Sequence, residues 1–143
     1  MKNIFEKIRD GEAEAEIVYK DEYITAFNDI NPDAPIHVLI IPNKTIKTLN
    51  DIDEDDSIYL SKILLGAKKI AKQFNIDENG YRLINNCNNH GGQEIDYLHF
   101  HLVGGVKLGK MISLSKTSKI IFEYFKNNKN NKNNKNNKNN KSN

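Results

Sequence analysis

Apolar and polar side chains alternate between residues 97 and 102, which is the pattern of a strand with one buried face. One face of this strand carries Leu98, Phe100 and Leu102. The other face carries Tyr97, His99 and His101. We expect the first face to pack in a core and the second to present two imidazoles side by side.

A longer segment in the middle of the chain has the spacing of a helix. The acidic residues from Asp51 to Asp56 precede it, and carboxylates suit a helix N-terminus. The apolar residues that keep helical spacing, and should form one buried face, are Ile63, Leu64, Ala67, Ile70, Ala71 and Phe74. The lysines at 62, 68, 69 and 72 lie off that face and should be solvated.

Shorter patterns predict the remaining elements. Asn3 can cap a helix from Ile4 to Arg9, and a second short helix fits Lys116 to Lys126. The predicted strands are Glu16–Lys20, Tyr23–Phe27, His37–Pro42 and Tyr81–Asn86. The apolar third strand should be central. Strands on both sides of one long helix predict an α+β domain on a mainly antiparallel sheet.

Composition limits the class of protein. A chain of 143 residues is long enough for one domain with its own core. The single cysteine, Cys87, excludes a disulfide framework and fits a reducing compartment. No apolar run could span a membrane, and the first residues lack the apolar core of a signal peptide. We therefore expect a cytoplasmic or nuclear protein with no membrane partner.

The net charge of +2 conceals two different parts. Residues 127–143 are five copies of Asn-Asn-Lys followed by Ser-Asn, with five lysines and no acid. The other 126 residues therefore carry a net charge of −3, and no specific nucleic-acid partner is expected. The repeat has no apolar residue to bury. We expect a folded domain over residues 1–126 and a disordered tail over residues 127–143.

The histidine strand follows a glycine-rich turn, His90–Gln93, and such turns can direct several backbone N–H groups at one anion. Imidazoles beside an anion site suggest chemistry on a phosphate. Two other interpretations stay open for the histidine pair. It could be polar residues on a solvated face, or ligands of a metal ion.

Two segments carry a resemblance to a known family. Phe27–His37 reads FNDINPDAPIH, and Gly91–Gly105 reads GGQEIDYLHFHLVGG. Both resemble the histidine triad (HIT) superfamily, most closely its Hint branch of purine nucleoside phosphoramidate hydrolases, and the resemblance runs from Ile4 to about Gly105. It implies a HIT-like fold and a homodimer joined through the long helix and strand Tyr81–Asn86. It implies no metal or other cofactor.

The resemblance also implies roles for individual residues. His99 corresponds to the nucleophile, His101 to the phosphate-binding histidine and His37 to a further family histidine. Asp29 would hold the ribose hydroxyls. The full set of implied nucleotide-binding residues is Phe5, Ile8, Phe27, Asp29, Ile30, Leu39, Asn86, Gly92 and Gln93. Three departures from the family pattern are Tyr97 for the first histidine, Glu94 for a serine and the absence of tryptophan.

Three functions follow from these residues. The leading one is hydrolysis of the P–N bond of purine nucleoside 5′-phosphoramidates through a nucleotidyl-histidine, with the nucleoside monophosphate as product. The second is a nucleotide-binding scaffold with weak or lost catalysis, because Tyr97 cannot carry a proton as an imidazole does near neutral pH. The third is a metal-binding protein that uses His37, His99 and His101.

Overall fold

The computed structural model describes residues 1–139, with side chains to residue 132, and divides the chain into two compact units, Met1–Leu108 and the segment from Gly109 onward. In chain order the elements are α1 (Ile4–Arg9), β1 (Ile17–Lys20), β2 (Ile24–Asn28), β3 (Ile36–Pro42), the 3-10 helices η1 (Leu49–Asp51) and η2 (Glu54–Asp56), α2 (Ser57–Gln73), β4 (Tyr81–Asn85), α3 (Asn88–Gly91), β5 (Phe100–Gly104) and α4 (Lys116–Asn139). The first unit holds every element except α4.

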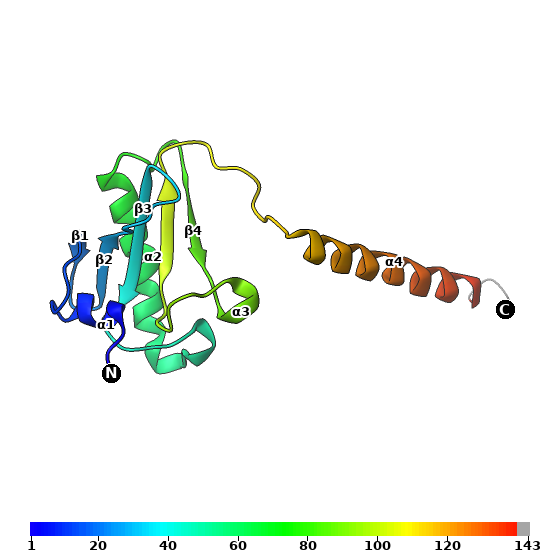
Figure 1. The fold of residues 1–143 in the computed structure, drawn as a ribbon, viewed down its shortest axis with the longest axis horizontal. Helices are drawn as coiled ribbons and strands as arrows, with labels where there is room; N and C mark the ends of the chain where they lie inside the picture. Colours follow the sequence, from blue (N-terminus) through cyan, green and yellow to red (C-terminus); the bar gives the residue numbers. More distant parts are fainter. Residues whose placement is uncertain (140–143) are drawn as a thin grey trace. The chain divides into compact units, whose positions relative to one another are not determined.

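Five strands form one sheet in the order β1-β2-β3-β5-β4, and every neighbouring pair is antiparallel (Figure 1). The apolar strand β3 occupies the middle, as the sequence predicts. Each of the four strands predicted before residue 90 agrees with the structure to within one residue at either end. The predicted α+β class with an antiparallel sheet is therefore confirmed.

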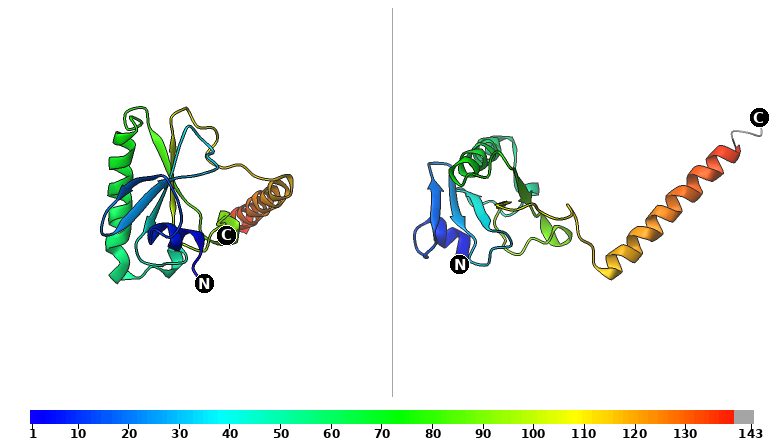
Figure 2. Two further views of the ribbon diagram at one scale, coloured as in Figure 1. Left: turned by 60° about the vertical axis from the view of Figure 1, so that its left-hand side comes forward. Right: turned by 90° about the horizontal axis from the view of Figure 1, so that it is seen from above.

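Helix α2 covers one face of the sheet, as the left view of Figure 2 shows. Ile63, Ala67 and Ile70 are buried there, in a cluster with side chains from β2, β3 and β5. The helix approaches β2 closely at Gly66, where a Cβ atom would lie 2.5 Å from Ile24 Cδ1. The prediction that Leu64 belongs to the buried face is wrong. Leu64 is 54% exposed, because it lies about 100° around the helix from Ile63.

Helix α1 packs against the opposite face of the sheet. Asn3 and Glu6 form a capping box at its start, as the Asn3 side chain accepts the Glu6 N–H and the Glu6 side chain accepts the Asn3 N–H. The buried cluster on this face consists of Phe5, Ile8, Phe27, Leu39, Ile41 and Tyr97. Both faces of the central strands are therefore covered.

The histidine segment is only partly a strand. Strand β5 begins at Phe100, and the Leu98 N–H donates to the Ile46 carbonyl, 2.7 Å away, outside the sheet ladder. The alternation is still confirmed, since Tyr97 packs in the α1 cluster and Leu102 in the α2 cluster. The expected glycine turn contains a short helix, α3, which ends where Gly92 adopts a left-handed φ of 78°.

The C-terminal segment differs from the sequence prediction. The expected helix Lys116–Lys126 is present, but α4 continues to Asn139 through most of the repeat that we expected to be disordered. The repeat contains neither glycine nor proline, so no residue in it stops a helix, and lysine is a good helix former. The predicted domain limit at residue 126 also differs from the unit boundary at Leu108. Residues 140–143 of the predicted tail lie outside the described part.

Candidate functional site

A cavity of about 580 Å³ opens on the α1 side of the sheet. It brings together most of the predicted site residues. Those that line it are Phe5, Ile8, Phe27, Asp29, Ile30, His37, Leu39, Asn86, Gly92, His99 and His101. The aromatic and aliphatic members come from α1, β2 and β3, except for Ile30 in the loop between β2 and β3. His99 directly precedes β5, and His101 lies within it. Ile30 lines the cavity while remaining 89% exposed.

His99 is buried at the side of this cavity, and one of its ring nitrogens is already engaged. Its Nδ1 lies 2.6 Å from the Tyr97 carbonyl oxygen. A carbonyl only accepts, so Nδ1 carries the proton and donates. Burial lowers the pKa of His99, with the Tyr97 carbonyl opposing that shift. The neutral ring therefore keeps an unprotonated Nε2, which is the form that a nucleophile requires.

A chain of hydrogen bonds sets the proton position on the other two histidines. The Asp33 backbone N–H donates to His37 Nδ1 at 3.0 Å, so that nitrogen carries no proton. The proton of His37 is then on Nε2, which lies 2.8 Å from His101 Nδ1. His101 Nδ1 accepts this bond, and the proton of neutral His101 is on its Nε2. His101 is thereby oriented as a donor next to the His99 ring, whose centroid is 5.0 Å away.

The pKa of His101 is strongly perturbed. Burial, together with the neighbouring His99 and His37, lowers it to about 4. His101 is therefore neutral near pH 7 and donates a hydrogen bond without carrying a full charge. Two neutral rings, one with a free lone pair and one with a free N–H, can attack and stabilise the same phosphoryl group.

Tyr97 is a core residue and does not line the cavity. It is fully buried against Phe5, and its hydroxyl donates to the Pro42 carbonyl oxygen. The Arg9 guanidinium donates to the same hydroxyl at 3.2 Å. Burial raises the pKa of the phenol, which keeps it protonated. Tyr97 contacts His99 Nδ1 through its main-chain carbonyl, and any residue at position 97 has such a carbonyl.

Two other predicted residues occupy different positions. Asp29 lines the cavity, with Oδ1 accepting the Asn31 N–H at 2.8 Å and Oδ2 lying 3.5 Å from His37 Nε2. Gln93 is absent from the lining, and its side chain bonds the backbone of Asn88, Lys47 and Ile95. Gln93 therefore holds the loop before the histidines, and its contact with a ligand stays a prediction.

Sequence reasoning missed Asn85, and it did not foresee the contacts of Asn86 and Glu94 in the structure. Asn85 donates from Nδ2 to the His99 carbonyl oxygen at 2.9 Å and thereby ties β4 to the histidine segment. Asn86 donates to the Gly91 carbonyl oxygen at 2.6 Å, which fixes the end of α3. Glu94 lines the cavity close enough to oppose the lowering of the His99 pKa. The paired asparagines before the turn were the available signal.

Both ring nitrogens of His37 and Nδ1 of His101 are used in hydrogen bonds, which leaves these atoms poorly placed to bind a metal ion. Among the described residues, Asp29, His37 and His101 offer ligand atoms within 4.8 Å of one another, a group with Asp29 in place of the expected His99. His37 Nδ1 is taken by the Asp33 amide, and its Nε2 shares a hydrogen bond with His101. A cation between the rings would need His37 and His101 to give up their shared bond.

The fold and the site together define an α+β domain in which three histidines gather at a cavity lined by both apolar and polar side chains. The chain belongs to the HIT family, because residues 10–108 match the family model described as the HIT domain. The chain is 50% identical over 110 residues to the purine nucleoside phosphoramidase of Escherichia coli K12, an alignment that covers 77% of this chain and 92% of that protein.

Other relatives agree with this assignment. A HIT-like protein of Buchnera aphidicola subsp. Baizongia pistaciae is 57% identical over 109 residues, with 76% of this chain and 97% of that protein covered. The crystal structure of a HIT family hydrolase from Legionella pneumophila superposes with a TM-score of 0.75 at 47% identity, and covers 77% of this chain and 98% of that one. The HIT resemblance and HIT-like fold predicted from the sequence are both confirmed.

Proposed function

We propose that this protein hydrolyses the P–N bond of purine nucleoside 5′-phosphoramidates. The observation that carries the proposal is the pair of fixed tautomers: a buried His99 with its Nδ1 bound to the Tyr97 carbonyl, beside a His101 whose Nε2 carries a proton. The name of the E. coli relative, half identical in sequence, supports the same class of substrate.

The chemistry proceeds by two displacements at phosphorus. His99 Nε2 attacks, the P–N bond breaks, and the amine leaves with a proton taken up from solvent, which gives a nucleotidyl-histidine. Water then attacks the same phosphorus, the bond to His99 Nε2 breaks, and the nucleoside monophosphate, neutral His99 and a proton returned to solvent result. His101 donates from Nε2 to a non-bridging oxygen, where negative charge grows during each displacement.

The rest of the cavity suits a nucleoside. Phe5, Phe27 and Leu39 supply an apolar wall for a base, and Phe5 and Phe27 stand edge to face at 5.4 Å. The Asp29 carboxylate lies on the same lining and can accept hydrogen bonds from ribose hydroxyls. Apolar walls with few polar groups are typical of sites that orient small molecules.

The decisive test replaces the nucleophile. His99→Ala should lower turnover of adenosine 5′-phosphoramidate by about 10⁴-fold or more, while AMP affinity measured by calorimetry changes little, since base and ribose contacts lie elsewhere. His90→Ala is the matched control, because His90 is exposed and does not line the cavity. Wild type that binds AMP but turns over no faster than His99→Ala would favour the nucleotide-binding scaffold.

We also propose a homodimer, supported by surfaces at one edge of the sheet. Strand β4 is one of the two edge strands of the sheet, and Tyr81 and Ile84 on it are exposed. Leu64 is exposed on α2, about 200° around the helix from Gly66, which contacts β2. Leu64 therefore lies on the flank of α2 toward β4. A second copy that packs on β4 and this flank would cover all three side chains.

A further inference from the structure

Helix α4 carries large apolar side chains on its surface. Five of them lie within six consecutive residues and are between 51% and 71% exposed. They are Ile120, Ile121, Phe122, Tyr124 and Phe125. Exposed apolar groups that are contiguous mark interaction surfaces more often than single ones do. The HIT family model ends at residue 108, so this surface lies outside the part that the family accounts for.

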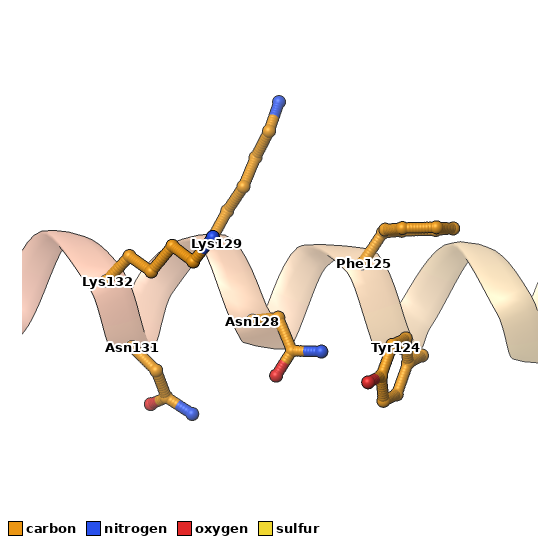
Figure 3. Close-up of a pocket in the computed structure, with 6 residues that line it drawn as sticks. All are labelled: Tyr124, Phe125, Asn128, Lys129, Asn131 and Lys132. Atoms are coloured by element: carbon orange, nitrogen blue, oxygen red, sulfur yellow. The ribbon is translucent and has the colours of Figure 1, made fainter.

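The first half of α4 is divided into two sides. Lys116, Lys119, Glu123 and Lys126 follow one another at spacings of three and four, which places them on one face of a helix. The apolar residues occupy the rest of the circumference. Figure 3 shows Tyr124 and Phe125 standing clear of the helix backbone, with Lys129 and Lys132 further along the same helix.

Charge is concentrated on the same unit. From residue 109 onward the chain has nine lysines and one acidic residue, which gives +8, whereas residues 1–108 carry 12 basic and 18 acidic residues, which gives −6. Lysine recurs every third residue over Lys126, Lys129 and Lys132, so successive lysines turn about 60° around the helix axis. An anionic surface of any kind attracts this unit.

We propose that α4 binds the surface of an anionic lipid membrane, with Ile121, Phe122 and Phe125 inserted among the lipids and the lysines over the headgroups. An apolar face, aromatic residues and a basic face are together the features of helices that lie in the membrane interface. No described helix is long and apolar enough to cross a membrane, and this mode requires none. It revises the sequence expectation of no membrane partner, which concerned spanning segments.

Lipid accounts for the surface better than other occupants do. A second α4 would bring together two segments of the same strong positive charge. A nucleic acid would satisfy the lysines but leave two isoleucines exposed, since nucleic-acid contacts use basic and aromatic groups. A bilayer interface takes both the apolar residues and the charge.

The test measures co-sedimentation of the full chain with vesicles of phosphatidylcholine alone or mixed with phosphatidylglycerol. We expect binding to the anionic vesicles only, weakened by added salt. Ile121→Ser with Phe125→Ser removes apolar surface at unchanged charge and should weaken binding at least about tenfold. Lys129→Asn with Lys132→Asn should weaken it on the order of thirtyfold, about fivefold per lysine.

Asn128→Ser with Asn131→Ser introduces the same two serines without loss of apolar surface or charge, and should bind as wild type does. Several results would overturn the proposal. They are no binding to anionic vesicles, equal binding to uncharged ones, or no effect of the Ile121 and Phe125 pair. Preferential binding of a single-stranded oligonucleotide would assign the unit to nucleic acid instead. A particle mass in light scattering that falls when Ile121→Ser and Phe125→Ser are introduced would instead assign the surface of α4 to contact with a second copy.

Discussion

Replacing Tyr97 by phenylalanine separates a structural role of this residue from a chemical one. The change removes only the hydroxyl, which donates to the Pro42 carbonyl and accepts from Arg9. The ring, its packing against Phe5 and the main-chain carbonyl that holds His99 all remain. The fold should therefore lose stability while the reaction keeps its rate.

The magnitude follows from the groups left behind. The Pro42 carbonyl loses a buried donor, and a buried polar group without its partner costs about 1–3 kcal/mol. Arg9 loses less, because its guanidinium also bonds Asp10 and Thr45 at an exposed position. We expect the free energy of unfolding, measured with urea, to fall by about 1–3 kcal/mol, with kcat for adenosine 5′-phosphoramidate nearly unchanged.

Tyr124→Phe is the matched control, since Tyr124 is exposed on α4 and its change should leave the unfolding free energy unaltered. Tyr97→His restores the family pattern, yet its side chain would enter the buried α1 cluster, so we expect no gain in kcat. A drop in kcat of more than about tenfold in Tyr97→Phe, with AMP affinity intact, would refute the reasoning. It would show that the hydroxyl takes part in the reaction.

Three further predictions concern other parts of the chain. Between pH 6.5 and about 4, His101 is protonated in the unfolded chain but neutral in the folded chain. The free energy of unfolding should therefore fall as the pH drops through this range, and the fall should be less steep in His101→Gln. Urea titrations at several pH values would measure both slopes. Leu64→Glu should have the mass of one chain in light scattering, whereas the wild type should have the mass of two chains. Leu65→Glu is the control and should stay dimeric, because Leu65 lies on the flank of α2 that lines a groove with Tyr19 of β1. Equal masses for the two variants would contradict the interface. Deletion of residues 127–143 should leave the melting temperature and AMP affinity almost unchanged, because no side chain described there is buried, and a large loss of stability would argue for a packing role.

Local pattern was enough to predict most of the sheet and the placement of the histidines. The period of two around His99 and His101 has a direct cause in strand geometry, and it holds although the strand itself starts only at Phe100. The burial of Leu64 was predicted wrongly, because helical spacing alone does not distinguish residues at the edge of a buried helix face from residues at its centre. The main-chain contacts of the site had no sequence signal, because every residue has a carbonyl and nearly every residue an amide.

One of these contacts has a consequence for how the site is prepared. The Asp33 amide belongs to a loop between Pro32 and Pro35, and it reaches His101 only through the His37 ring. The direction of both rings is thus decided when the loop closes during folding, before any ligand enters. The entropic cost of orienting the two imidazole rings is therefore incurred once, during folding, and does not recur in each catalytic cycle. The backbone of this loop therefore sets the tautomers of His37 and His101, and substitutions of surface side chains should leave these tautomers unchanged.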